Sequence, residues 1–404
     1  MDAFEPSCLI SRQALIHNAS LVRRAIGPDV KICAVVKADA YGHSAAIVAD
    51  ALCNYSTDDL EAPLVDCLAV ADLDEAGALP ELPLPLLILR PIESAFLGGG
   101  RRRFEEAIHH GWTLTICSGA AAMDLARIAL ASGQRANVHI KIDTGMSRAG
   151  VSLAEFQRLA EKVLSLPSLR LTGLYTHFAC GELAGDGFTS KQLADFRAAT
   201  DGLVNDGRPM RHAANSGAMF VASESRLDMV RPGISLYGID PTGRPSVDRK
   251  LRPVLKWKAP LLSIREVPTG TSVGYGRSFV ADTPAKIGLV PVGYADGYLR
   301  QFSNRAVVML HDRPCPVVGR VSMDFLTIDV TDCPAAAVGD AVTLLDSNPL
   351  SPASVYRLAE WGGTIPYEIL CRIGRRVRRI AVEPAEESGI QPGWRKRMEM
   401  QNDE

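Results

Sequence analysis

The chain has 404 residues, of which 47% are hydrophobic and 22% are charged, and this balance is typical of globular proteins. Its 44 Lys and Arg side chains nearly cancel its 46 Asp and Glu side chains, so no overall field favours nucleic acid or a membrane surface. The length exceeds that of one typical domain, and we therefore expect two domains and a small-molecule function.

The amino terminus, MDAFEPSCLI, is acidic and lacks the basic-then-apolar order of a signal peptide. No stretch approaches the roughly 20 apolar residues that a membrane-spanning helix needs. The nine cysteines are scattered without a CxxC pair, which fits a reducing compartment better than disulfides or a zinc site. We therefore expect a cytoplasmic protein with no membrane partner and no metal.

The first part of the chain alternates short β-rich apolar runs with segments of helical spacing. One intervening helix is predicted where Ser152 and Glu155 form a capping box ahead of an apolar stripe of Phe156, Leu159 and Val163. The candidate strands are residues 31–39, 67–72, 84–90, 114–119, 137–143, 169–178, 211–216 and 229–238. Eight strands alternating with helices predict an α/β fold, a closed (β/α)8 TIM-type barrel over residues 1–240. An open, doubly wound sheet is the alternative fold.

After residue 240 the pattern changes to a charged, turn-rich connector and then mostly to strands. Further strands are predicted at 255–259, where Leu255, Trp257 and Ala259 alternate with two lysines, and at 285–292, 306–310, 316–321, 325–330 and 341–345. Only residues 354–362 indicate a helix. We expect a mostly-β C-terminal domain over residues 241–383 and a loosely ordered polar tail over 384–404.

Polar residues of types that are costly to bury follow several barrel strands, where the active sites of such barrels lie. They are Lys37, Lys141, Arg148, His177, Asn215, Ser216 and Arg231. A lysine at the mouth of an apolar barrel is a candidate for Schiff-base chemistry. Gly217 and Gly233 leave backbone amides accessible after the seventh and eighth strands, as a phosphate-binding turn requires. The set therefore predicts a cup for an anionic ligand.

Each of these residues also has a purely structural interpretation. His177 could be a satisfied core histidine, Arg231 a surface cap, and Asn215 with Ser216 an ordinary turn. The basic run GRRVRR near Arg376 is interpreted as a solvated or interface face, and LGGGRRR at 97–103 as a solvated loop. No GxGxxG follows the first strand and no P-loop or HExxH pattern occurs, which counts against nucleotide and metal sites.

Nine segments in fixed order carry a resemblance to a known family. They are AVVKADAYGHS, VHIKIDTGMSRAGV, GLYTHFA, HAANSGA, VRPGISLYG, VGYGRSF, PVGYADGY, VVGRVSMDF and GTIPYEIL. Together they span about residues 31–375, and on this basis the chain resembles the alanine racemases. The resemblance implies a barrel that binds pyridoxal 5'-phosphate, followed by a β-rich domain that supplies a second catalytic base.

By matching position, the resemblance makes Lys37 the cofactor-binding lysine and one base, and Tyr275 the opposing base for the other enantiomer. It also implies a homodimer in which the tyrosine reaches the active site of the second subunit. Because a phenol titrates near ~10, the tyrosine needs cationic or hydrogen-bonded neighbours, and His177 and Arg231 are expected to supply them. Arg231 would face the pyridine nitrogen of the cofactor.

The remaining site residues are also implied by the resemblance. The cofactor-binding set is Lys37, Tyr41, Arg148, His177, Asn215, Ser216, Arg231, Gly233, Ile234 and Tyr367. The substrate-binding set is Arg148, Met323 and Tyr294, the last of these limiting the size of the substrate side chain. Lys141 matches a position that is a carbamylated lysine in some members. Gly274 and Ser322 depart from the residues that are common in the family, without removing a catalytic group.

The implied function is racemisation of L-alanine and D-alanine, supplying D-alanine for peptidoglycan. Two alternatives remain open: a racemase of broader specificity that acts on serine, and a pyridoxal-phosphate-binding protein without turnover. The tyrosine of GYADGY counts against the first, and the second domain with Tyr275 and Met323 counts against the second. A decarboxylase of related fold is disfavoured because its EPGR-type phosphate segment is missing and the GGG at 98–100 lies far too early to be its glycine triplet.

Overall fold

The structure is a computed structural model that describes residues 5–54, 64–93, 100–203, 209–246 and 248–383. Two compact units are present. The barrel unit consists of Asn18–Ala40 and Val48–Leu236. The C-terminal unit consists of Met1–His17, Tyr41–Ile47 and Tyr237–Glu404, so two short N-terminal segments belong to it as well. The expected tail, 384–404, lies outside the described residues.

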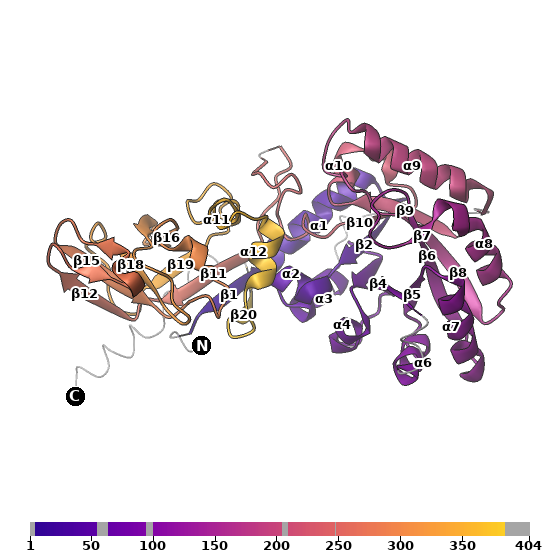
Figure 1. Ribbon diagram of the computed structural model, residues 1–404, viewed down its shortest axis with the longest axis horizontal. Coiled ribbons are helices and arrows are strands. Elements are labelled where there is room, and N and C mark those ends of the chain that lie inside the picture. Colours follow the sequence, from indigo (N-terminus) through magenta and orange to yellow (C-terminus); the bar gives the residue numbers. More distant parts are fainter. Residues whose placement is uncertain (1–4, 55–63, 94–99, 204–208, 247, 384–404) are drawn as a thin grey trace. The chain divides into compact units, whose positions relative to one another are not determined.

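The barrel unit contains a closed sheet of eight parallel strands (Figure 1). The strands are β2 (Lys31–Val35), β3 (Cys67–Val70), β4 (Leu86–Ile92), β5 (Thr113–Ile116), β6 (Ala136–Asp143), β8 (Leu169–Tyr175), β9 (Met210–Asn215) and β10 (Met229–Arg231). Each pairs with its neighbours in the order β5-β4-β3-β2-β10-β9-β8-β6, and β5 pairs with β6 to close the ring. The predicted TIM-type barrel is thus confirmed, and the open sheet is excluded. A short strand, β7 (Val151–Ser152), adds to β6.

Helices precede the first strand of the barrel and connect the later ones. They are α1 (Arg12–Ile26), α2 (Lys37–Gly42), α3 (Ala45–Cys53), α4 (Leu73–Ala78), α6 (Arg101–His109), α7 (Gly119–Ala131), α8 (Leu153–Leu164), α9 (Gly187–Thr200) and α10 (Ala218–Val221), with short 3-10 turns η1 (Asp201–Leu203) and η2 (Ser223–Ser225). Helix α8 buries Phe156, Leu159 and Val163, as its spacing predicts. The predicted capping box is wrong in detail, because the Ser152 hydroxyl donates to the Glu155 carboxylate at 2.8 Å and caps no backbone amide.

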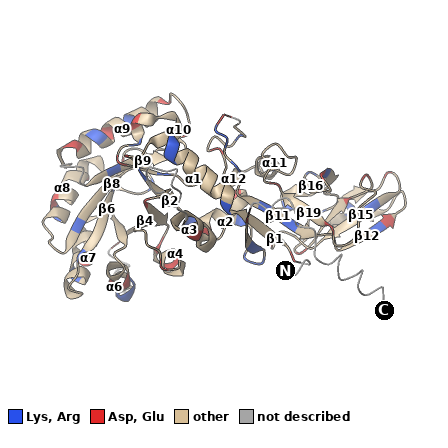
Figure 2. Cartoon of the chain, turned by 180° about the vertical axis from the view of Figure 1, so that it is seen from behind, with Lys and Arg blue, Asp and Glu red and all other residues tan. Residues whose placement is uncertain are grey.

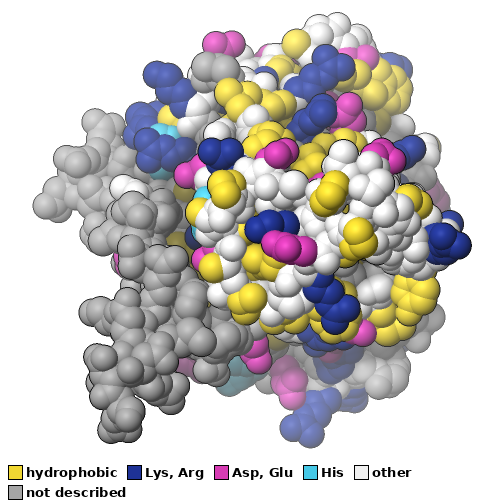
Figure 3. Space-filling model, turned by 90° about the vertical axis from the view of Figure 1, so that its left-hand side faces the viewer, with side chains coloured by type: hydrophobic (Ala, Val, Ile, Leu, Met, Phe, Trp, Pro, Cys, Tyr) yellow, Lys and Arg dark blue, Asp and Glu magenta, His cyan; other side chains and the backbone are white. Residues whose placement is uncertain are grey.

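Opposite charges alternate on the outer helices, as the near-zero net charge leads one to expect. Figure 2 shows basic and acidic residues near one another along α9, where Lys191 Nζ lies 2.5 Å from Asp195 Oδ2. The face in Figure 3 likewise exposes hydrophobic side chains at several separate places, with charged side chains of both signs between them. Among the described residues, no helix has the length and apolar character needed to cross a membrane.

The C-terminal unit is mostly β, as predicted. Its six-stranded sheet has the order β17 (Arg313–Pro316), β16 (Val307–Leu310), β19 (Ala341–Leu345), β11 (Leu255–Pro260), β1 (Ser7–Ser11) and β20 (Arg378–Val382). A three-stranded sheet joins β12 (Ser263–Val267), β15 (Ala285–Val290) and β18 (Leu326–Asp329), and β13 (Ser272–Val273) pairs with β14 (Phe279–Val280). The helices are α11 (Val355–Gly362) and α12 (Pro366–Arg372), with the 3-10 turns η3 (Tyr275–Arg277) and η4 (Arg300–Phe302).

Three details of this unit differ from the sequence prediction. The strand expected at 316–321 is wrong, because β17 ends at Pro316 and Gly319 turns the chain with φ +76°. Helix α12, which Pro366 starts at its first turn, was not predicted. Strand β1 lies between β11 and β20, so the first strand of the described residues pairs with the last of them rather than with the barrel.

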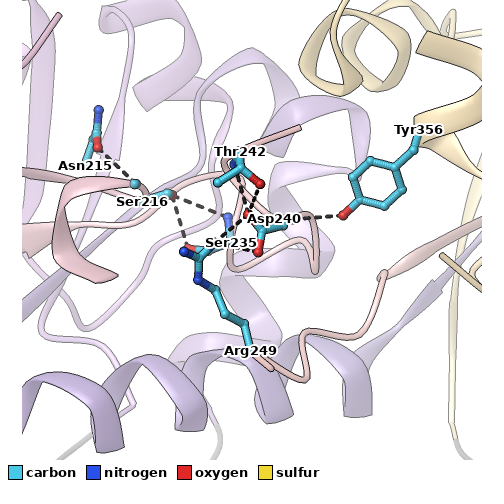
Figure 4. A network of polar contacts seen from close by, with 8 residues as sticks. Asn215, Ser216, Ser235, Asp240, Thr242, Arg249 and Tyr356 are labelled. Atoms are coloured by element: carbon cyan, nitrogen blue, oxygen red, sulfur yellow. Dashed lines mark hydrogen bonds and ion pairs between the residues drawn. The ribbon is translucent and has the colours of Figure 1, made fainter. Parts of the chain in front are cut away.

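The connector after residue 240 is held by one buried carboxylate, that of Asp240 (Figure 4). Its Oδ1 accepts hydrogen bonds from the backbone and hydroxyl of Thr242, at 2.9 and 2.6 Å, and both of its oxygens contact Arg249 at 2.5 and 2.6 Å. The Asp240 amide donates to the Tyr356 hydroxyl at 2.9 Å. A charged, turn-rich segment is thereby fixed, because the buried charge is paired and hydrogen-bonded.

Candidate active site

The predicted polar residues of the barrel unit do lie at the carboxyl ends of its strands. Lys37 follows β2 by two residues and is half-buried. His177 follows β8 by two residues, whereas Asn215 and Arg231 are the last residues of β9 and β10. In a closed parallel barrel all these positions share one end, so the structure brings them to the same face.

The backbone after Lys37 forms a left-handed turn. Ala38, Asp39, Ala40 and Tyr41 have φ of 53°, 52°, 55° and 54°. Such a conformation costs roughly 1–2 kcal/mol for each L-residue and persists only where the surrounding structure imposes it. The Ala38 amide donates to Glu75 Oε1 at 2.8 Å, and the Ala40 amide donates to the Val36 carbonyl at 2.8 Å. Backbone strain is thus concentrated directly after the predicted cofactor lysine.

Arg231 is a cation with four hydrogen-bond acceptors at this end of the barrel. The side chain is buried, and it donates to the Thr176 carbonyl at 2.7 Å and to the Ala213 carbonyl at 3.0 Å. It also donates to His212 Nδ1 at 2.7 Å and to His177 Nδ1 at 3.4 Å. Burial lowers the pKa of Arg231. The four acceptors compensate for that burial and fix the direction of the guanidinium group.

The contacts of Arg231 also determine the protonation state of two histidines. A guanidinium group can only donate, so His212 must accept at Nδ1 and carry its proton on Nε2. That nitrogen lies 3.1 Å from His139 Nδ1, and donates to it. Burial and the charge of Arg231 lower the pKa of His139 to about 3 and lower that of His212 as well. Both rings are therefore neutral, and the hydrogen bonds run in one direction from Arg231 through His212 to His139.

Two predicted side chains near Arg231 have perturbed pKa values. Burial, then the charges of Arg231 and Arg148, lower the pKa of His177 to about 3, with smaller effects from Lys141 and Lys37. His177 is therefore neutral, so any effect it has on the tyrosine would come from hydrogen bonding and not from charge. Burial and the nearby Arg148 lower the pKa of Lys141 to about 8.

The loops after β9 and β10 converge on the Ser216 hydroxyl (Figure 4). The Gly233 amide donates to Ser216 Oγ at 2.8 Å, and the hydroxyl of Ser235 lies 3.1 Å from it. Asn215 has a structural role in this turn, because its Oδ1 accepts from the amides of residues 217 and 218, each at 3.0 Å. These polar groups lie after the seventh and eighth strands, where barrels of this type often bind phosphate.

Two predicted tyrosines lie together in the C-terminal unit. The ring of Tyr41 is 5.0 Å from that of Tyr237 and 6.1 Å from that of Tyr367, measured between centroids. Burial raises the pKa of Tyr41, so its hydroxyl is a neutral donor. Gly42 permits this packing, because a Cβ there would lie 2.4 Å from the Leu370 carbonyl oxygen.

The predicted second base is exposed. Tyr275 is 72% exposed in η3, next to Gly274, whose φ of 75° favours glycine. A groove of about 310 Å³ is lined by Tyr275, Arg320, Ser322 and Phe325, together with neighbouring residues of β15 and β18. Tyr294 and Met323, predicted to bind substrate, are also large exposed apolar side chains of this unit.

Sequence reasoning missed His139, Tyr175 and His212, which fill the barrel below Arg231. The Tyr175 ring stacks on His212 at 4.8 Å, and Arg231 lies over it at 5.1 Å. The alternation of side chains along a strand could have identified His139. His139 precedes Lys141 by two residues, and residues two apart in a strand face the same side.

Comparisons with known proteins agree with this architecture. Residues 10–241 match the family description "Alanine racemase, N-terminal domain", and residues 254–381 match "Alanine racemase, C-terminal domain". The chain belongs to the alanine racemase family. The resemblance inferred from the nine sequence segments is therefore confirmed.

Individual members of the alanine racemase family are similar over almost the whole chain. The alanine racemase of Halothermothrix orenii is 37% identical over 372 residues, which are 92% of this chain and 95% of that protein. That of Chlorobaculum tepidum is 38% identical over 376 residues, 93% and 94% of the two chains. The structure of the Clostridium difficile 630 alanine racemase has a TM-score of 0.85 at 34% identity and covers 94% of this chain and 96% of that one.

Alanine racemases depend on pyridoxal phosphate. The Bartonella henselae alanine racemase structure, with a TM-score of 0.79 and 29% identity, covers 94% of this chain and 99% of that one and holds covalently bound pyridoxal phosphate. The described part of this chain holds no group of three or more His, Cys, Asp or Glu side chains arranged for a metal ion.

Proposed function

We propose that this protein interconverts L-alanine and D-alanine with pyridoxal phosphate, using Lys37 and Tyr275 as the two bases. The observation that carries the proposal is the buried Arg231, fixed by four acceptors at the barrel end where Lys37 lies. Family membership agrees with it. When bound, the cofactor supplies an electron-accepting ring that stabilises negative charge at the substrate Cα.

The barrel residues fit such a cofactor. The Ser216 hydroxyl, the Gly233 amide and the backbone of Ile234 would bind the phosphate, and the first two already lie within hydrogen-bond distance of each other. Arg231 would face the pyridine nitrogen. Since an arginine holds its proton firmly and its position is fixed by His212, it would leave that nitrogen largely unprotonated. A less electron-withdrawing ring limits the lifetime of the carbanion and hence side reactions such as transamination.

Racemisation needs a proton to leave one face of Cα and another to arrive on the opposite face. Lys37 Nζ would serve one face and Tyr275 Oη the other. Because His177 is neutral, the positive charge that favours the tyrosine's phenolate has to come from the arginines, Arg231 and Arg148.

The exposure of Tyr275 supports a homodimer with shared active sites. A general base works best where water is excluded, yet 72% of this side chain is exposed in the single chain. Met323 and Phe325, at 53% and 43% exposure, are further uncovered apolar groups of the same unit. We propose that a second copy of this chain covers them and receives Tyr275.

The remaining assignments are proposals of the same kind. Tyr41, Arg148, His177, Asn215 and Tyr367 would complete the cofactor site, and Arg148, Met323 and Tyr294 would bind the substrate. Carbon dioxide adds to neutral amines, and the lowered pKa of Lys141 supports its carbamylation. The free thiols of all nine cysteines, among them Cys315 and Cys333 with sulfurs 3.5 Å apart, support a cytoplasmic location. A supply of D-alanine for peptidoglycan is proposed from the family resemblance.

The proposal is tested by incubating the purified protein and pyridoxal phosphate with L-alanine in deuterium oxide, and following optical rotation and deuterium incorporation at Cα together. L-serine and L-arginine are assayed in parallel. Rapid loss of rotation with alanine alone is expected. Equal rates with serine would identify a racemase of broader specificity, and absence of both exchange and racemisation would revive a binding protein without turnover.

A further inference from the structure

The basic run that sequence analysis assigned to a solvated or interface face contains one arginine with a specific pair of partners. Arg376 Nε donates to Asp296 Oδ1 at 2.8 Å, while its two terminal nitrogens lie 3.0 and 2.9 Å from Asp324 Oδ1. Asp296 is buried, with 4% of its side chain exposed, whereas Arg376 and Asp324 are about half-exposed at 55% and 47%. One guanidinium group thus joins two carboxylates that are 28 positions apart in the printed sequence.

Each carboxylate belongs to a loop that carries a proposed substrate residue. Asp324 directly follows Met323, and Asp296 follows Tyr294 by two residues. Asp296 also organises its own loop, because its second oxygen accepts from the Gly293 amide at 2.9 Å. Arg376 therefore contacts each loop within two residues of its proposed substrate residue, which is Met323 in one loop and Tyr294 in the other.

The two loops are also in direct contact. The amide of Tyr294 donates to the Ser322 carbonyl at 3.0 Å, and the amide of Ala295 donates to the Met323 carbonyl at 3.0 Å. A Cβ on Gly293 would lie 2.2 Å from the Met323 carbonyl oxygen, so only glycine permits this approach. A change in one loop would consequently move the other.

We propose that Arg376 is a positioning residue that sets substrate affinity and side-chain selection by holding the Tyr294 and Met323 loops in register. The inference rests on the proposed function, which assigns those two residues to the substrate. Arg376 itself does not act on the reacting atoms. Its effect passes through Asp324 and Asp296 to the backbone on either side.

The small contribution of the Arg376–Asp324 ion pair to stability allows its positioning role to be tested separately from folding. The contact between Arg376 and Asp324 is largely exposed, and exposed ion pairs contribute only about 0–1 kcal/mol to stability. Asp324→Asn keeps the shape of the side chain and removes its charge, so it should barely alter unfolding. A defect in that variant would therefore report on position rather than on folding.

The neighbouring arginines provide contrast and control. Arg379 donates to four carbonyls, those of Gly42, Gly374, Val377 and Ile373, and so has a structural role. Arg375 is exposed and lies in the same basic run. The control variant Arg375→Gln therefore removes one positive charge from the run but keeps the Arg376 side chain that contacts Asp296 and Asp324.

The experiment compares wild type, Asp324→Asn, Arg376→Gln, Arg376→Lys and Arg375→Gln as holoenzymes. The measurements are KM and kcat for L-alanine, the ratio of kcat/KM for serine to that for alanine, cofactor absorbance and the thermal midpoint. In Asp324→Asn and Arg376→Gln we expect KM to rise roughly tenfold and the serine-to-alanine ratio to rise, with unchanged cofactor absorbance. Lysine has a single ammonium group and cannot reproduce the paired contacts of the guanidinium group. In Arg376→Lys the KM and the serine-to-alanine ratio should therefore lie between those of wild type and those of Arg376→Gln.

If KM and the substrate ratio of Asp324→Asn and Arg376→Gln match those of Arg375→Gln while wild type racemises alanine, the inference is overturned and the proposed function stands. A defect in thermal midpoint alone would also overturn it, since a merely structural ion pair predicts that result. If wild type does not racemise alanine at all, the proposed function and this inference fall together.

Discussion

A single methyl group placed at Gly173 should disrupt the buried histidine network. Gly173 in β8 pairs with His139 in β6, and a Cβ there would lie 2.5, 2.6 and 2.7 Å from three atoms of that ring. Ordinary carbon contacts are about 3.5–4.0 Å, so in Gly173→Ala the ring must move by about 1 Å. His139 would then lose its hydrogen bond from His212.

The magnitude follows from these two effects. Inserting a methyl group into a packed core costs roughly 1–3 kcal/mol, and losing one buried hydrogen bond costs about 0.5–1.5 kcal/mol. Alanine recovers roughly 0.5–1 kcal/mol because glycine is more flexible in the unfolded chain. The net destabilisation of Gly173→Ala should be roughly 0.5–4 kcal/mol, with the thermal midpoint falling about 2–4 °C for each kcal/mol in a unit of this size.

Urea and thermal unfolding of holoenzyme and apoenzyme measure this effect. The matched control is Gly77→Ala in α4, because a Cβ there meets nothing within 4 Å and stability should not fall. Equal stability of Gly173→Ala, Gly77→Ala and wild type would refute the reasoning, because the ring of His139 would then have room to move without cost.

Three further predictions concern the bases and the histidines. Lys37→Ala should abolish the absorbance of covalently bound cofactor, and an unchanged spectrum would reject that lysine. Tyr275→Phe should keep the spectrum but lower racemisation about 10²–10⁴-fold, so full activity would refute the two-base assignment. The folded-state pKa values of His139 and His177 are lowered to about 3, so below about pH 6.5 the unfolded chain binds more protons than the folded one. The free energy of unfolding should therefore fall as the pH decreases from about 6.5 to 3. A urea midpoint that stays constant over that range would contradict the neutrality of the two histidines.

Local patterns were sufficient to predict the architecture. Apolar runs alternating with helical spacing predicted all eight barrel strands, because burial on both faces leaves a continuous hydrophobic run in the sequence. Candidate site residues near strand ends, such as Lys37 and Arg231, could also be identified. The carboxyl ends of parallel strands in a closed barrel lie at one face, independent of the conformation of the loops. Prediction was weaker in the C-terminal unit, where strands are short, and where the polar segment of β12 gives little periodic signal.

The sequence alone determined the fold class, the two-part organisation and the family. Only the tertiary structure decided that His177 is neutral, that Ala38–Tyr41 adopt positive φ, that β1 pairs with β20, and that Arg376 joins Asp296 to Asp324. The physical reason is the range of the interactions. Periodicity is a property of neighbouring residues, whereas a pKa, a strained turn or an ion pair depends on groups that folding brings together from distant parts of the chain.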